Sequence, residues 1–159
     1  MRTTKKFNLG FTLIEVLVYI ALLSILLSGA LAVTYQVLQS SESVQAKTTI
    51  DEESDFIFHK FDWALNNSTI NSPVAGTADP ILSLNKAGFA QNPIVFDLNS
   101  GNIRIKRGTQ TANELNSVNI KITNLLFTHI APSTGKPAAI HLSFTANGRL
   151  YEKTRYLRK

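Results

Sequence analysis

The sequence contains no cysteine among its 159 residues. This absence excludes disulfides, thiolate metal ligands and cysteine nucleophiles. Small exported domains often depend on disulfides, so any part of this chain outside a membrane must be held together by packing and hydrogen bonds alone. The length allows one domain plus an appendage, because the chain is too short for two independent cores.

Proline is also absent from residues 11–65, and Gly29 is the only glycine there. Residues 11–33 are apolar and carry a single charge, on Glu15. A helix of this length, at ~1.5 Å per residue, matches the ~30 Å hydrocarbon core of a bilayer. Residues 34–66 then place apolar side chains at helical spacing between acidic ones. The sequence therefore predicts one continuous helix of about 55 residues, ending in the polar residues 66–68, whose second part buries one apolar stripe.

The acid in this apolar segment needs an explanation. A carboxylate in a membrane helix costs roughly 2.5–3.5 kcal/mol at the bilayer centre and less near the end, so Glu15 is expected to have a partner. Four small residues further along share one helix face at spacings of three, four and four: Ala21, Ser24, Ser28 and Ala32. Such a face lets membrane helices approach closely, although alanine and serine are also common in simple anchors.

Residues 67–159 are expected to form a loop followed by an antiparallel sheet, because apolar residues alternate with a period of two from residue 93 onward. Residues 68–92 are expected to form a loop with one short strand at 81–84. Residues 93–106 predict a hairpin, and residues 118–122 a further strand before a bulge at Asn124. Asn147 and Gly148 predict the turn of a second hairpin. The sum is an α+β fold: a long N-terminal helix packed by its second half on an antiparallel sheet of about four to six strands.

Charge is distributed unevenly. Residues 1–10 carry +3 with no acid, residues 11–65 carry −5 and residues 66–159 carry +7. A cationic flank before a full-length apolar segment predicts a retained anchor with its N-terminus inside and its C-terminus outside. The basic run at 149–159 has three interpretations: contact with DNA phosphates, contact with the acidic helix of a neighbouring subunit, or charges that protect an edge strand from aggregation. The edge-strand interpretation is favoured over DNA, because aromatic residues suitable for stacking are few there.

Nothing in the sequence predicts catalysis. The three histidines are far apart, no Ser/His/Asp arrangement has a motif around it, and no glycine-rich phosphate loop is present. The acidic run at 51–55 is typical of a solvated helix face, because a calcium site needs converging oxygens from a loop. We therefore expect no enzyme activity, no cofactor and no metal site.

Residues 10–15, GFTLIE, resemble the processing site of type IV prepilins and type II secretion pseudopilins. The resemblance implies a pilin-like fold and a cationic leader, residues 1–10, with its charges on Arg2, Lys5 and Lys6. It also implies that prepilin peptidase cuts between Gly10 and Phe11 and that Phe11 becomes the methylated N-terminus. Glu15 would then pair with the N-terminal amine of a neighbouring subunit, which supplies the missing partner for the acid.

The resemblance further implies the setting. The partners would be prepilin peptidase, other pilin or pseudopilin subunits, an inner-membrane assembly platform and the lipid bilayer. The protein would reside in the bacterial cytoplasmic membrane and then in a filament. The missing mid-helix proline and the missing disulfide differ from many major pilins and favour a minor pilin or minor pseudopilin. Two alternatives stay open: a competence pseudopilus component for DNA uptake, and a single-pass membrane-anchored binding domain in which Gly10 and Glu15 have no special role.

Overall fold

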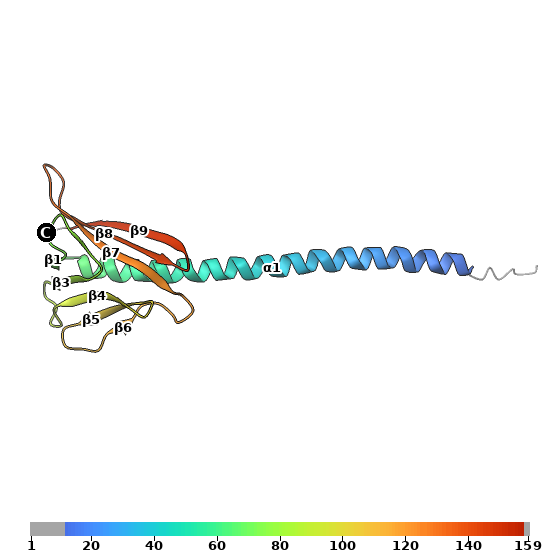
Figure 1. Cartoon of the computed structure of the whole chain (residues 1–159), viewed down its shortest axis with the longest axis horizontal. Coiled ribbons are helices and arrows are strands. Elements are labelled where there is room, and N and C mark those ends of the chain that lie inside the picture. The colour runs from blue at the N-terminus through green and yellow to red at the C-terminus, as the bar shows by residue number, and fades with distance from the viewer. Residues whose placement is uncertain (1–11, 158–159) are drawn as a thin grey trace, which may run out of the picture. The chain divides into compact units, whose positions relative to one another are not determined.

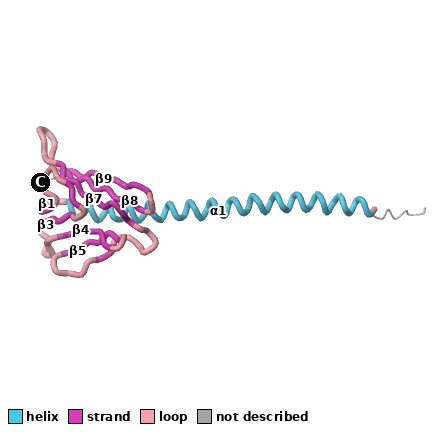
Figure 2. Tube along the Cα trace, in the orientation of Figure 1, coloured by secondary structure: helices cyan, strands magenta, loops and turns pink. Residues whose placement is uncertain are grey.

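The structure is a computed structural model that describes residues 12–157. The predicted leader charges and the predicted cleavage and methylation positions, Gly10 and Phe11, lie outside the described residues. The chain divides into two compact units, one up to Ala46 and the other from Lys47 onward. A single continuous helix, α1 (Leu13–Leu65, 53 residues), runs from the first into the second. Its end at Leu65 confirms the predicted stop, and Figure 2 shows that strands and loops follow it.

The first unit of the described chain is the N-terminal part of α1. Thr12 lies just before the first residue of α1 and caps the helix. The backbone N–H of Glu15 donates to the Thr12 carbonyl at 3.1 Å and lies 3.3 Å from the Thr12 Oγ1. Threonine followed three residues later by glutamate is the capping-box pattern of helix starts. Within residues 12–157, α1 is long and apolar enough to cross a membrane, by length and composition. Apart from the half-buried Glu15, the side chains of its apolar segment from Thr12 to Val33 are exposed.

The second unit contains two antiparallel sheets around the C-terminal part of α1. One sheet has the order β1-β3-β4-β5-β6 and the other β2-β7-β8-β9. In Figure 1, strands β3–β5 and strands β7–β9 lie on either side of the last turns of α1. The strands are β1 (Ser68–Ser72), β2 (Ala78–Asp79), β3 (Leu82–Lys86), β4 (Ile94–Asn99), β5 (Asn102–Arg107), β6 (Asn113–Glu114), β7 (Ile122–Ile130), β8 (Ala139–Ala146) and β9 (Arg149–Tyr156).

Both predicted hairpins are confirmed. β4 and β5 pair around Ser100 and Gly101, which have φ values of 54° and 85°. β8 and β9 pair around Asn147 and Gly148, with φ values of 46° and 84°. Two successive residues with positive φ match the right-handed twist of the flanking strands, which is why Asn-Gly favours this turn. The predicted bulge is confirmed as well, because Asn124 has φ 54° where the β7–β8 register shifts.

Three expectations about strands were wrong. The single sheet of four to six strands is instead two sheets, of five and four strands. The expected loop at 68–92 contains β1 and β2 in addition to β3. Residues 118–121 are not a strand. Asn116 binds this region instead: its Oδ1 accepts from the Ile103 N–H at 2.8 Å and its Nδ2 donates to the Ile120 carbonyl at 2.7 Å. Ile120 is thereby buried without strand pairing.

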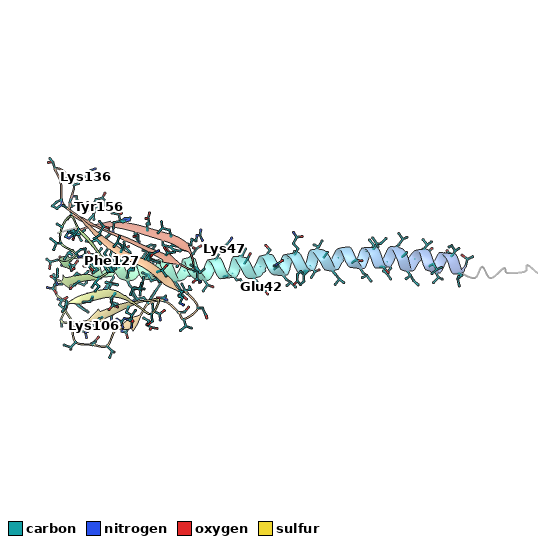
Figure 3. The ribbon with its side chains drawn as sticks, viewed as in Figure 1. Glu42, Lys47, Lys106, Phe127, Lys136 and Tyr156 are labelled. Carbon is teal, nitrogen blue, oxygen red and sulfur yellow. The ribbon has the colours of Figure 1, made fainter. Side chains whose placement is uncertain are left out.

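The core forms where the apolar stripe of α1 meets both sheets. Of the predicted apolar stripe, Ile57, Phe61 and Leu65 are buried, and the neighbouring Phe58 is buried with them. The expectation that the stripe is buried from residue 37 onward was wrong, because Val37 and Val44 lie before the sheets and are exposed. The second unit, from Lys47 onward, is called the head below. In it, the ring centroid of Phe61 lies 6.2 Å from that of Phe127 on β7, which Figure 3 labels. Phe58 packs on Phe144 of β8 at 5.5 Å. Such aromatic contacts add to the burial term, so they fix this part of the helix on the sheets.

Candidate functional site: Glu15 and the apolar helix

Glu15 lies in the first turn of α1, and its carboxylate contacts the polar end of Tyr19 on the same face. The Tyr19 hydroxyl donates to Glu15 Oε1 at 3.3 Å. Residues four apart are adjacent on a helix surface, which allows this bond. The Tyr19 side chain is exposed, whereas Glu15 is half-buried. Tyr19 was not among the residues predicted from the sequence, although the four-residue spacing is a signal that could have found it.

The other hydroxyls of the apolar segment turn back to their own helix. Ser24 Oγ donates to the Ile20 carbonyl at 2.7 Å, Ser28 Oγ to the Ser24 carbonyl, and Thr34 Oγ1 to the Ala30 carbonyl at 2.9 Å. Such bonds to the preceding turn satisfy the hydroxyls where no water is present. Ser24 and Ser28 therefore present small surfaces with satisfied donors. The predicted packing face, which also includes Ala21 and Ala32, stays a prediction.

The acidic part of α1 contacts the basic part of β9 within the same chain. Arg149 Nη1 lies 3.1 Å from Asp51 Oδ1, and the Tyr151 hydroxyl donates to the same oxygen at 2.5 Å. Lys153 Nζ lies 2.8 Å from Asp62 Oδ2. Burial, followed by the hydrogen bond to the Asp51 carboxylate, raises the pKa of Tyr151. Part of the basic charge that could serve a neighbouring subunit or DNA is thus already paired within the chain.

β9 is also an edge strand of its sheet, as the edge-strand interpretation expected. Its inward side chains, Tyr151 and Lys153, are partly buried, while Glu152 and Tyr156 are exposed. Figure 3 labels Tyr156 and Lys136 among the side chains drawn on the head. Charged residues on an exposed edge oppose pairing with another chain.

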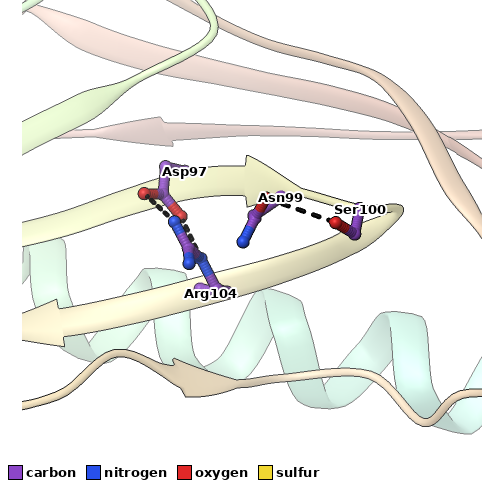
Figure 4. A network of polar contacts seen from close by, with 4 residues as sticks. All are labelled: Asp97, Asn99, Ser100 and Arg104. Atoms are coloured by element: carbon purple, nitrogen blue, oxygen red, sulfur yellow. Dashed lines mark hydrogen bonds and ion pairs between the residues drawn. The ribbon is translucent and has the colours of Figure 1, made fainter.

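A separate ion pair stabilises the β4–β5 hairpin. Arg104 Nε and Nη2 lie 2.8 Å and 2.7 Å from the two carboxylate oxygens of Asp97, as Figure 4 shows. This two-point hydrogen bond raises the pKa of Arg104. Asp97 and Arg104 face each other across the antiparallel pair, so the contact fixes the strand register rather than forming a binding site.

The histidines do not converge on a site. His129 Nδ1 lies 2.8 Å from the Pro73 carbonyl oxygen, and His141 Nδ1 lies 2.9 Å from Thr154 Oγ1. Within residues 12–157, no group of three or more histidine, aspartate or glutamate side chains could hold a metal ion. An open, mostly apolar groove of about 1390 Å³ runs past the first residues of β1, His129 and Leu157.

Residues 5–31 match the prokaryotic N-terminal methylation motif, a segment that includes Gly10, Phe11 and Glu15. No curated protein and no solved structure matches the chain significantly. The matched segment defines a protein with a prepilin-type N-terminus. The long apolar helix that packs by its C-terminal part on antiparallel sheets begins inside this matched segment.

Proposed function

We propose that this protein is a minor pilin or minor pseudopilin, a structural filament subunit without catalytic activity. The observation that carries the proposal is the methylation motif at residues 5–31, which overlaps the start of an apolar helix of membrane-spanning length. Prepilin peptidase removes residues 1–10 by cutting between Gly10 and Phe11, and Phe11 is methylated. Arg2, Lys5 and Lys6 keep the leader on the cytoplasmic side of the inner membrane, so the single pass places the C-terminus outside.

Assembly then proceeds through the N-terminal helix. Residues 11–33 hold the subunit in the bilayer and later form the filament core, residues 34–66 continue the helix, and residues 67–159 complete the head. Leaving the bilayer is feasible because neighbouring helices offer surface as apolar as lipid, with close approach along the Ala21–Ser24–Ser28–Ala32 face. The inner-membrane assembly platform and other subunits are the partners of this step.

Glu15 has the decisive role in this assembly. Its carboxylate accepts the methylated amine of a neighbouring Phe11, and this ion pair offsets the cost of holding each charge in an apolar medium. The helix N-terminus favours an anion in its first turn, which supports the carboxylate before the amine arrives.

The subunit belongs to the minor class because residues 11–33 lack proline and the chain lacks cysteine. A nucleic-acid partner is not proposed, because Arg149 and Lys153 already pair with α1.

Filament incorporation of charge variants tests the proposal. Glu15→Ala should leave the protein in the membrane fraction of filament-producing cells and greatly reduce its amount in sheared filaments. Glu42→Ala is the matched control, because Glu42 is an exposed acid on the same helix outside the apolar segment. Figure 3 labels Glu42 on α1. Equal incorporation of the two variants would contradict the proposed role and favour an anchored binding domain.

A further inference from the structure

We propose that Tyr19 is a positioning residue for Glu15: within the apolar segment, its hydroxyl holds the carboxylate in the orientation that receives a neighbouring amine. The inference rests on the proposed function, since it assigns a second residue to the same assembly step. The observation behind it is the hydrogen bond from the Tyr19 hydroxyl to Glu15 Oε1 at 3.3 Å.

The pattern of hydroxyl bonds in the segment singles out this contact. Ser24, Ser28 and Thr34 each donate to the carbonyl one turn back, so their hydrogen bonds end within the backbone. A tyrosine side chain is too long for that return bond, and its donor must reach another acceptor where water is absent. In the structure, this acceptor is the Glu15 carboxylate. The Tyr19 hydroxyl thus donates to the acid, whereas the serine and threonine hydroxyls donate to the backbone.

The geometry leaves capacity for the amine. A carboxylate has two oxygens and about four acceptor positions. Among residues 12–157, Tyr19 is the side chain that donates to the Glu15 carboxylate, and it uses Oε1. Oε2 is thus available to an ammonium group from a second chain. Thr12 fixes the Glu15 backbone in the first turn, and Tyr19 fixes the end of its side chain. An acceptor held at both ends loses less conformational freedom when the partner binds.

The contact can be measured directly by fluorine NMR. The full chain is labelled with 3-fluorotyrosine and placed in lipid nanodiscs, and the Tyr19 signal is assigned from its loss in Tyr19→Phe. The chain has four tyrosines, and Tyr35 is an internal control because it is exposed on the same helix. Glu15→Ala should shift the Tyr19 signal and leave the Tyr35 signal in place. An unmoved Tyr19 signal would overturn the pairing.

A double-mutant cycle tests whether Tyr19 acts through Glu15. Tyr19→Phe should lower filament incorporation several-fold, whereas Tyr35→Phe should incorporate normally. The double variant Glu15→Ala/Tyr19→Phe should incorporate no less than Glu15→Ala alone, because the effect of Tyr19 requires the carboxylate. If the fold-reductions of the two single variants multiply in the double variant, Tyr19 merely packs against neighbours and the inference is wrong. Normal incorporation of Tyr19→Phe would also overturn the inference.

The two experiments separate this inference from the function on which it rests. If Glu15→Ala incorporates normally, the assembly role of Glu15 is wrong, and the role of Tyr19 in that step is wrong with it. If Glu15→Ala blocks incorporation but the Tyr19 fluorine signal does not respond to it, the proposed function stands and only the positioning role of Tyr19 is overturned.

Discussion

Replacing Phe61 with alanine tests how α1 is held in the head. Phe61 is fully buried, and its ring centroid lies 6.2 Å from that of Phe127. Phe→Ala substitutions at such core positions cost about 3–5 kcal/mol, from lost transfer energy and the cavity that remains. Because domains of this kind are stable by about 5–15 kcal/mol in total, the variant should lose a large part of its stability.

Urea unfolding of the full chain in detergent micelles measures this loss. Trp63, the only tryptophan, reports on the head because its ring packs edge-on against Phe89 at 5.5 Å. For small proteins the free energy of unfolding falls by about 1–3 kcal/mol per molar urea. The urea midpoint of Phe61→Ala should therefore be lower than that of the wild type by on the order of 2 M. Phe56→Ala is the matched control on the same helix: Phe56 is 46% exposed, and its loss should cost no more than about 1 kcal/mol.

Two results would show that the buried Phe61 does not hold α1 on the sheets. Equal midpoint shifts for Phe61→Ala and Phe56→Ala would mean that burial on α1 does not determine stability. A negligible shift for Phe61→Ala would mean that the second half of the helix is not docked on the sheets through this side chain.

Two further predictions concern the β8–β9 hairpin and are read by the same urea assay. Asn147→Ala should lower stability by about 1–2 kcal/mol, because it removes the 2.8 Å bond from the Lys121 N–H and places alanine at positive φ; an unchanged midpoint would contradict this. Because the pKa of Tyr151 is raised in the folded state, its hydroxyl loses its proton at a lower pH in the unfolded chain than in the folded one. The free energy of unfolding should therefore fall above about pH 10, by at most ~1.4 kcal/mol per pH unit. The stability difference between wild type and Tyr151→Phe should therefore narrow from pH 9 to 11, with Tyr156→Phe as the exposed control, and a constant difference would contradict the assignment.

The features predicted correctly from the sequence are those with strong local signals. The apolar stripe through Ile57, Phe61 and Leu65 repeats at helical spacing, and a helix with one apolar face must bury it. Asn147 and Gly148 determine their turn because few other residues tolerate two positive φ values. The N-terminal methylation motif is equally local, because it is a continuous run of sequence at residues 5–31.

The features that were missed depend on contacts between distant residues. β1 has the sequence STINS, with no alternation of apolar residues, and it is a strand because β3 lies beside it. Arg149 pairs with Asp51, which lies 98 positions earlier in the sequence. Pairing between the charges of α1 and β9 is therefore not visible until the fold is known. For Tyr19 the spacing was visible, but spacing alone does not show that the hydroxyl is directed at Glu15.

The most direct test of the whole account is the intact mass of the protein purified from native membranes, measured beside a Gly10→Ala variant. The native chain should begin at Phe11 and carry one added methyl group, while the variant should retain residues 1–10 and carry no methyl group. A native chain that still begins at Met1 would contradict prepilin processing, and with it the proposed place of Glu15 in filament assembly.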